Sequence, residues 1–220
     1  MKKLISIALT AMMLMSLAAC SHSENNPVEK QLKVETESSN ETEVMMTEDA
    51  SLAEKENVRA GSGKGVIVVY FSATGTTKGI AEKIAAAADA DIYEIAAAQA
   101  YTDEDRDYND PDSRTSVEQN DDTARPEIGS DTISLEGYDT VFIGYPIWWG
   151  REPRIMDTFV ESYRFDGITM IPFCTSGSSS IGNSGYNLAE CAGSGNWLEG
   201  RRFDADASEE EIEEWIRGLK

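Results

Sequence analysis

Histidine is nearly missing from this chain, because His22 is the only one among its 220 residues and lies close to the N-terminus. A catalytic triad or a zinc site built on histidine is therefore not expected in the rest of the sequence. Basic side chains are scarce as well, with 19 lysines and arginines against 40 acidic residues and a formal net charge of -21. Nucleic-acid binding and polybasic attachment to anionic lipid both need clustered cations, so this composition argues against both.

The longest apolar run stands at the N-terminus. Lys2 and Lys3 precede the apolar run 4–19, which is too short to span a bilayer comfortably and is typical of a secretory signal peptide. The run ends in Leu-Ala-Ala-Cys20 and resembles a bacterial lipobox, whose cysteine takes a diacylglyceryl group before cleavage leaves it N-terminal. We therefore expect residues 1–19 to be a lipoprotein signal peptide and lipid on Cys20 to anchor the chain on the extracytoplasmic side of a membrane. The alternative is an ordinary secretory signal that ends near a cysteine.

Residues 20–64 are rich in glutamate, serine, threonine and asparagine and contain almost no aromatic residue. Such a composition cannot bury enough apolar surface to offset the chain entropy lost on folding. We expect a disordered tether with a reach of roughly 35–40 Å, estimated from about 44 flexible residues.

Residues 65–220 have the pattern of one α/β domain. The run 66–71 is apolar and β-branched throughout, as in a parallel strand covered on both faces. Further strands are predicted at 92–95, 140–145, 169–173 and 197–203, and helices at 79–88, 153–163, 183–191 and 208–219. Strands that alternate with helices indicate right-handed crossovers and a doubly wound parallel sheet. The polar stretch 96–137 is too long for an ordinary connection, and we expect a helix at 112–123 to replace the second crossover helix.

The loop after the first predicted strand is suited to a phosphate. It brings backbone N–H groups and a helix N-terminus to one point and adds several hydroxyls. It is neither a Walker loop nor a G-x-G-x-x-G turn. The alternative is a hydroxyl-rich turn without a ligand. The candidate ligand residues of this loop are Ser72, Ala73, Thr74, Gly75, Thr76 and Thr77.

Two further loops follow the third and fourth predicted strands and should meet the first at the carboxyl edge of the sheet, where ligands of such sheets bind. The third strand leads into Pro146, Ile147, Trp148, Trp149 and Gly150. The fourth leads into a loop of small, hydrogen-bonding residues, of which Thr175, Ser176, Gly177 and Ser178 are the candidates.

The first loop resembles the flavodoxin phosphate loop T/S-x-T-G-x-T, and the three loops in order resemble the FMN-contacting loops of flavodoxins. The resemblance covers residues 65–220 and implies a five-stranded parallel sheet of order 2-1-3-4-5 with FMN as cofactor. It further implies that the first loop wraps the FMN phosphate and that Thr175 to Ser178 bind the pyrimidine edge. Trp148 is our first candidate to stack on the flavin and Trp149 the second, with a core or edge position as the alternative for Trp149. Gly150 would let the backbone approach flavin N5.

Three functions remain open at this point. The first is an FMN-binding electron carrier that serves redox proteins at the membrane, and no side chain is assigned a catalytic role in it. The second is an FMN-dependent NAD(P)H or quinone oxidoreductase, for which the connection 101–127 would shape room above the flavin. The third is a binding lipoprotein without redox activity. Cys174 and Cys191 allow a disulfide, a redox pair that exchanges electrons with the flavin, or two inert buried thiols.

Overall fold

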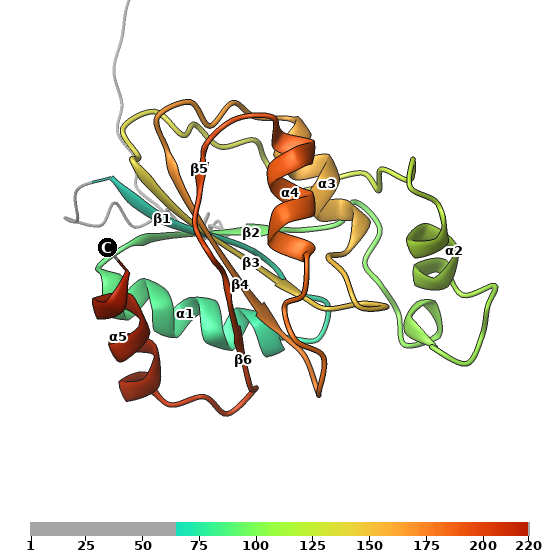
Figure 1. The fold of residues 1–220 in the computed structure, drawn as a ribbon. Coiled ribbons are helices and arrows are strands. Elements are labelled where there is room, and N and C mark those ends of the chain that lie inside the picture. The colour runs from blue at the N-terminus through green and yellow to red at the C-terminus, as the bar shows by residue number, and fades with distance from the viewer. Residues whose placement is uncertain (1–64, 220) are drawn as a thin grey trace, which may run out of the picture. The chain divides into compact units, whose positions relative to one another are not determined.

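A parallel sheet forms the centre of the computed structural model, which describes residues 65–219 (Figure 1). All of its strand pairs are parallel, and the order β2-β1-β3-β4-β5 confirms the expected topology. The strands are β1 (Val66–Phe71), β2 (Asp91–Ile95), β3 (Thr140–Pro146), β4 (Thr169–Thr175), β5 (Asn196–Trp197) and β6 (Arg201–Phe203).

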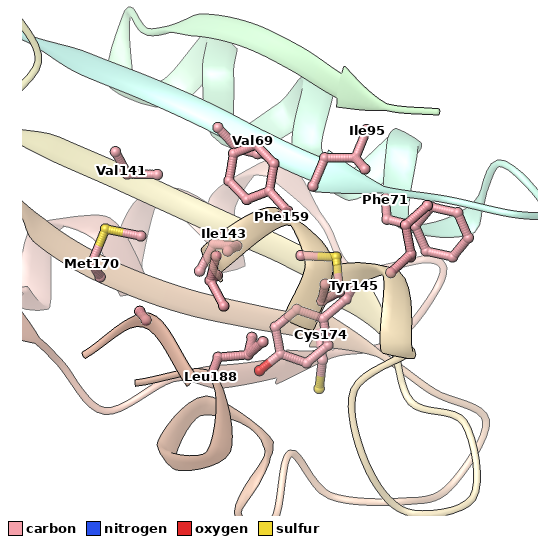
Figure 2. Packing of buried hydrophobic residues seen from close by; sticks show 14 of the residues in the cluster. Val69, Phe71, Ile95, Val141, Ile143, Tyr145, Phe159, Met170, Cys174 and Leu188 are labelled. Atoms are coloured by element: carbon pink, nitrogen blue, oxygen red, sulfur yellow. The ribbon is translucent and has the colours of Figure 1, made fainter. Parts of the chain in front are cut away.

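Helices cover both faces of the sheet, which explains why β1 is apolar along its whole length. On one face lie α1 (Thr76–Ala88) and α5 (Glu209–Gly218), and on the other lie α3 (Arg154–Glu161) and α4 (Ser184–Ala192) (Figure 1). Alternate residues of β1 enter the two cores, because Val68 packs in the core that contains Ile80 of α1 and Val69 in the core that contains Phe159 of α3. Figure 2 shows the second core, in which Leu188 of α4 also lies.

Most predicted elements are confirmed with small shifts at their ends. The first helix begins at Thr76, three residues before its predicted start, and the third begins at Arg154, directly after Pro153. Ser208 caps α5, since its hydroxyl accepts a hydrogen bond from the backbone N–H of Glu211 at 3.2 Å.

The fifth strand is not the continuous run 197–203 that the sequence predicted. It is split into β5 and β6, and both pieces pair with β4. The carbonyl of Met170 accepts a hydrogen bond from the N–H of Leu198 at 2.9 Å, so the backbone of Pro172, two residues further along β4, faces the same neighbour. Proline has no N–H to continue this ladder, and the edge strand is interrupted beside it.

The long connection between β2 and β3 contains a short 3-10 turn, η1 (Glu104–Arg106), and the helix α2 (Arg114–Asn120). This helix lies within the predicted range 112–123, but it does not replace a crossover helix. Figure 1 shows α2 set apart from both helix layers. Irregular residues of the connection, among them Ile128, Ile133 and Leu135, pack on the sheet in its place.

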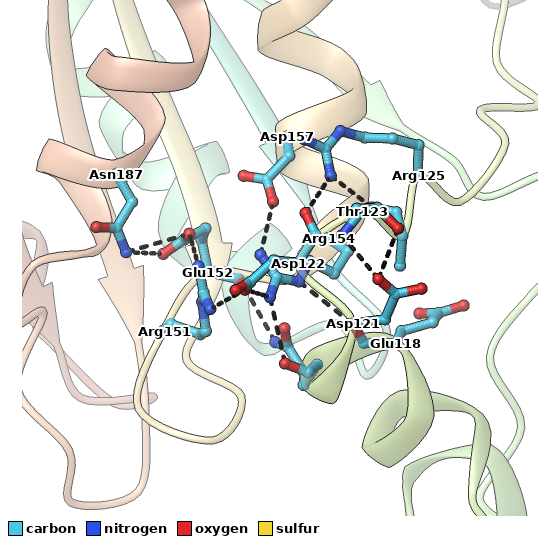
Figure 3. A network of polar contacts seen from close by, with 12 residues as sticks. Glu118, Asp121, Asp122, Thr123, Arg125, Arg151, Glu152, Arg154, Asp157 and Asn187 are labelled. Atoms are coloured by element: carbon cyan, nitrogen blue, oxygen red, sulfur yellow. Dashed lines mark hydrogen bonds and ion pairs between the residues drawn. The ribbon is translucent and has the colours of Figure 1, made fainter. Parts of the chain in front are cut away.

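Charged side chains of α3 attach the connection to the domain (Figure 3). Arg154, which is almost fully buried, donates to the backbone carbonyls of Glu118 and Gln119 at 3.3 Å and pairs with Asp122 and with the buried Asp157. Arg125 forms a two-point ion pair with Glu161, with N–O distances of 2.8 and 2.7 Å. Burial raises the pKa of the Asp157 carboxyl, whereas the hydrogen bond from Arg154 opposes that rise.

The expectations for the signal peptide, for Cys20, for His22 and for the tether concern residues outside the described range. Within residues 65–219, no helix is both long and apolar enough to cross a membrane.

Gly144 provides a test of the packing between β3 and β4. A Cβ at this position would lie 2.7 Å from Cε1 of the Phe173 ring and closer still to its Cε2 and Cζ, and that ring is fully buried. We expect Gly144→Ala to lower the free energy of unfolding by about 1–3 kcal/mol, because the core must shift to admit the methyl group. Urea unfolding monitored by circular dichroism measures the change.

The control is Gly79→Ala in α1, where a Cβ meets nothing within 4 Å. This substitution should stabilise the domain by about 0.4–1 kcal/mol, since alanine loses less backbone entropy than glycine in a helix. Equal stability of the Gly144→Ala variant and the wild type would contradict the proposed packing.

Candidate functional site

A cavity of about 470 Å3 lies at the carboxyl edge of the sheet, where the loops after β1, β3 and β4 meet. Of the predicted site residues, those that line it are Thr74, Thr76, Pro146, Ile147, Trp148, Thr175, Ser176 and Gly177. The predicted site residues that do not line it are Ser72, Ala73, Gly75, Thr77, Trp149, Gly150 and Ser178. The three loops therefore meet as predicted, although they contribute unequally to the cavity.

The first loop offers hydrogen-bond donors that the protein itself leaves unused. The Ser72 hydroxyl is buried and has no hydrogen-bond partner among the described residues. Gly75, with a φ of 84°, caps α1, no side chain caps this helix, and its first turn contains no acidic residue. Unpaired N–H groups at a helix N-terminus attract anions, and a buried hydroxyl without a partner costs about 1–3 kcal/mol. A phosphate would satisfy both, so these residues fit such a group.

Other side chains of the loop have roles inside the protein. The hydroxyl oxygens of Thr77 and Thr175 lie 2.8 Å apart in a buried hydrogen bond that joins the first loop to the third. Those of Thr74 and Thr76 lie 3.2 Å apart at the cavity. Lys78 is not among the lining residues, and its ammonium group lies 3.5 Å from the Glu94 carboxylate. The loop thus presents neutral donors to the cavity.

The two candidate tryptophans occupy different environments. Trp148 is only 5% exposed and packs edge-on against Phe71 and Tyr101, with ring centroids 5.6 and 5.1 Å away. Trp149 is 38% exposed and lies against Tyr108 at a centroid distance of 4.6 Å. Trp148 therefore forms a rigid wall of the cavity, whereas Trp149 belongs to an exposed aromatic pair close to it.

A tight turn reverses the chain after Trp148. The backbone N–H of Arg151 donates to the Trp148 carbonyl at 3.0 Å, and the N–H of Trp148 donates back at 2.9 Å. The two residues between them, Trp149 and Gly150, have φ angles of 49° and 79°. Two positive φ angles are typical of a type I′ turn, which glycine adopts easily and tryptophan does not.

The third loop is held by a residue that the sequence analysis did not identify. Arg202 of β6 donates to the hydroxyl of Ser176 at 3.1 Å and to its carbonyl at 2.9 Å, and it also pairs with Asp204. Because β6 is parallel to β4, its carboxyl end lies at the same edge of the sheet as the third loop.

Five lining residues were not predicted: Arg106, Tyr108, Asp204, Ala205 and Asp206. The last three follow β6, and the rule that the carboxyl ends of parallel strands share an edge would have identified them. Arg106 and Tyr108 come from the long connection, where no local pattern indicates which residues turn toward the cavity. Arg106 pairs with Asp103.

The cysteines show no sign of a redox pair. Both Cys174 and Cys191 are free, and burial raises the pKa of the Cys174 thiol to about 12. A thiol in that state is a poor nucleophile at neutral pH. Among residues 65–219, no group of three or more histidine, cysteine or acidic side chains is arranged to hold a metal ion.

Comparisons with known proteins agree with the fold. A family model described as Flavodoxin matches residues 65–219. A candidate flavoprotein from Bacteroides uniformis is 48% identical, with a TM-score of 0.67, and the match covers 70% of this chain and 99% of that one. A candidate flavoprotein from Bacteroides eggerthii is also 48% identical at a TM-score of 0.67, with 72% and 100% covered.

A flavoprotein from Lactobacillus acidophilus, solved in complex with FMN, is 25% identical with a TM-score of 0.50, and the match covers 70% of this chain and 99% of that one. A search of curated protein sequences finds no significant match. The family model covers the whole described sheet with its helices, and the Bacteroides proteins match over nearly their full length. The chain therefore belongs to the flavodoxin family.

Proposed function

We infer that this protein binds FMN in the cavity and carries electrons through it while lipid on Cys20 holds the chain at the extracytoplasmic face of a membrane. The observation that carries the cofactor assignment is the first loop, where the buried Ser72 hydroxyl and the uncapped N-terminus of α1 lack partners in the described residues. The related Lactobacillus acidophilus protein was solved with FMN and supports the same ligand.

FMN would supply the redox chemistry, and the protein residues bind it, orient it and set its potential. The first loop holds the phosphate with neutral donors. Trp148, fixed by Phe71 and Tyr101, gives the cavity wall an apolar edge for contact with the ring system, and aromatic contacts contribute about 0.5–1.5 kcal/mol beyond area burial. The Thr175–Gly177 segment offers hydroxyl and backbone groups to a polar ring edge.

The charges around the cavity favour a low reduction potential. Asp206 lines it together with Asp204, which is paired with Arg202, and the only cation among the lining residues, Arg106, is paired with Asp103. Negative charge added to the flavin on reduction is opposed chiefly by the Asp206 carboxylate. Each 1.4 kcal/mol of such opposition lowers a one-electron potential by about 59 mV.

A second candidate function is an FMN-dependent NAD(P)H or quinone oxidoreductase. The exposed pair of Tyr108 and Trp149 favours it, because Tyr108 lines the cavity and aromatic rings beside it offer a planar substrate a place to stack. In the described residues we assign no acid, base or nucleophile to such a reaction, so the carrier function is preferred.

The first prediction concerns the phosphate end of the site. Replacing Thr74 and Thr76 together by alanine should weaken FMN binding at least tenfold, since a hydrogen bond to a charged group contributes about 1.5–3 kcal/mol. Riboflavin, which lacks the phosphate, should bind the variant and the wild type equally. Quenching of flavin fluorescence measures both affinities. The control is Thr132→Ala, an exposed site that does not line the cavity. An equal loss of affinity for FMN and for riboflavin in the double variant would place the phosphate elsewhere.

The second prediction separates a carrier from an enzyme. Stepwise reduction of the FMN-loaded protein with dithionite should show a distinct one-electron stage in the visible spectrum. Mixing with excess NADH or NADPH in a stopped-flow instrument should leave the flavin oxidised over seconds. Rapid bleaching by either nucleotide would favour the oxidoreductase instead.

The third prediction concerns the anchor. In a bacterial host, the full chain should fractionate with membranes and enter the detergent phase of a Triton X-114 extraction. Cys20→Ser should release it into the aqueous phase, because acyl chains contribute about 0.8 kcal/mol per buried methylene. Cys191→Ser is the matched control and should remain anchored. Aqueous partitioning of the unsubstituted chain would refute the lipid anchor.

A further inference from the structure

The turn that follows β3 needs support from its surroundings. Trp149 has a φ of 49°, and a left-handed conformation costs a residue other than glycine about 1–2 kcal/mol. Such strained residues persist only where neighbouring structure holds them. Trp148, the first residue of the turn, lines the cavity, so the position of the turn sets the position of this wall.

Gln119 of α2 holds the first residue of this turn and the residue that follows it. Its side-chain amide donates to the carbonyl of Trp148 at 3.3 Å and to the carbonyl of Glu152 at 3.0 Å. The side chain is only 6% exposed. Both neighbours are carbonyl oxygens, which accept hydrogen bonds and cannot donate them, so the NH2 group of Gln119 must face the turn.

This arrangement leaves the other half of the carboxamide without a partner. The side-chain oxygen of Gln119 is buried and accepts no hydrogen bond from any described residue. A buried acceptor without a donor costs about 1–3 kcal/mol. A leucine at this position would avoid that cost but would lose both bonds to the turn. The hydrogen bonds to the turn are therefore what glutamine provides at this position and an apolar residue would not.

The backbone that carries Gln119 is itself fixed. Arg154 of α3 donates to the carbonyls of Glu118 and Gln119 and so caps the end of α2 (Figure 3). At the other end of α2, the Ser113 hydroxyl accepts from the N–H of Ser116. Glu152, which follows the turn, is fully buried and its carboxylate accepts from Asn187 of α4. The turn is thus held between α2 and the α3–α4 layer.

We propose that Gln119 is a positioning residue for the flavin: it fixes the Trp148 turn against the ring end of the cavity and makes the long connection part of the cofactor site. This proposal rests on the proposed FMN function. Two parts of the site would bind different ends of FMN. The first loop would bind the phosphate, and the turn held by Gln119 would support the ring. A substitution at Gln119 should therefore lower the affinity for FMN and the affinity for riboflavin by the same factor.

The test uses the full chain with Gln119→Leu, which removes both donors, and with Gln119→Glu, which keeps the length but places a carboxylate against two carbonyls. Val117→Ala is the matched control, since Val117 lies on the same helix and is 54% exposed. Fluorescence titrations give the affinity for FMN and for riboflavin, and thermal unfolding of the flavin-free protein shows whether each variant folds.

We expect both Gln119 variants to bind FMN and riboflavin five- to tenfold more weakly, with the wild-type ratio of the two affinities, and Val117→Ala to bind as the wild type does. A role limited to stability would lower the unfolding temperature and leave the affinities unchanged, which would overturn the proposal. So would a loss confined to FMN, because it would assign the effect to the phosphate end. If Gln119→Leu does not fold, the Gln119→Glu variant decides alone. If the wild type binds neither flavin, the proposed function fails first.

Discussion

A protein with a formal net charge of -21 can hold a phosphate dianion only where its own donors are kept clear of its carboxylates. The loop between β1 and α1 meets this condition. It contains no acidic side chain, the first turn of α1 contains none either, and the glycine before the helix leaves the N-terminal amides without a side-chain cap. The partial positive charges of these backbone N–H groups therefore attract an anion although the whole protein is negatively charged. They do so over the short distance at which helix termini are effective. In the proposed function, the placement of the flavin at the sheet edge would depend on this one anchoring point.

The remaining walls of the cavity are positioned by contacts that reach far along the chain. Thr77 joins the first loop to the third through Thr175, and Arg202 of β6 holds Ser176 from the other side. Trp148 is wedged between Phe71 and Tyr101. Each loop is thus fixed by an element that is distant in sequence, so the cavity walls form together only when the sheet is complete.

The buried charges near α3 have a comparable role. Arg154 and Asp157 are almost entirely removed from water, and such pairs are weak contributors to stability because desolvation cancels much of their attraction. Arg154 nonetheless makes contacts that an apolar residue could not make, since it donates to two backbone carbonyls at the end of α2. These bonds give the α2 part of the connection one defined position on the domain.

Local patterns in the sequence identified the strands, the helices that cover them and the three loops at their carboxyl ends, because apolar periodicity and turn chemistry depend on neighbouring residues. They failed where the outcome depends on a partner that is remote in sequence. The fifth strand is split because Pro172 lies beside it on β4, and the end of α2 is fixed by hydrogen bonds from Arg154 of α3. Likewise, Arg106 and Tyr108 reach the cavity only because the fold brings their segment to the sheet edge. The sequence by itself determined the layered fold and the loop of neutral donors after β1. The walls of the cavity were decided by tertiary contacts, whose energies depend on distances that no local pattern encodes.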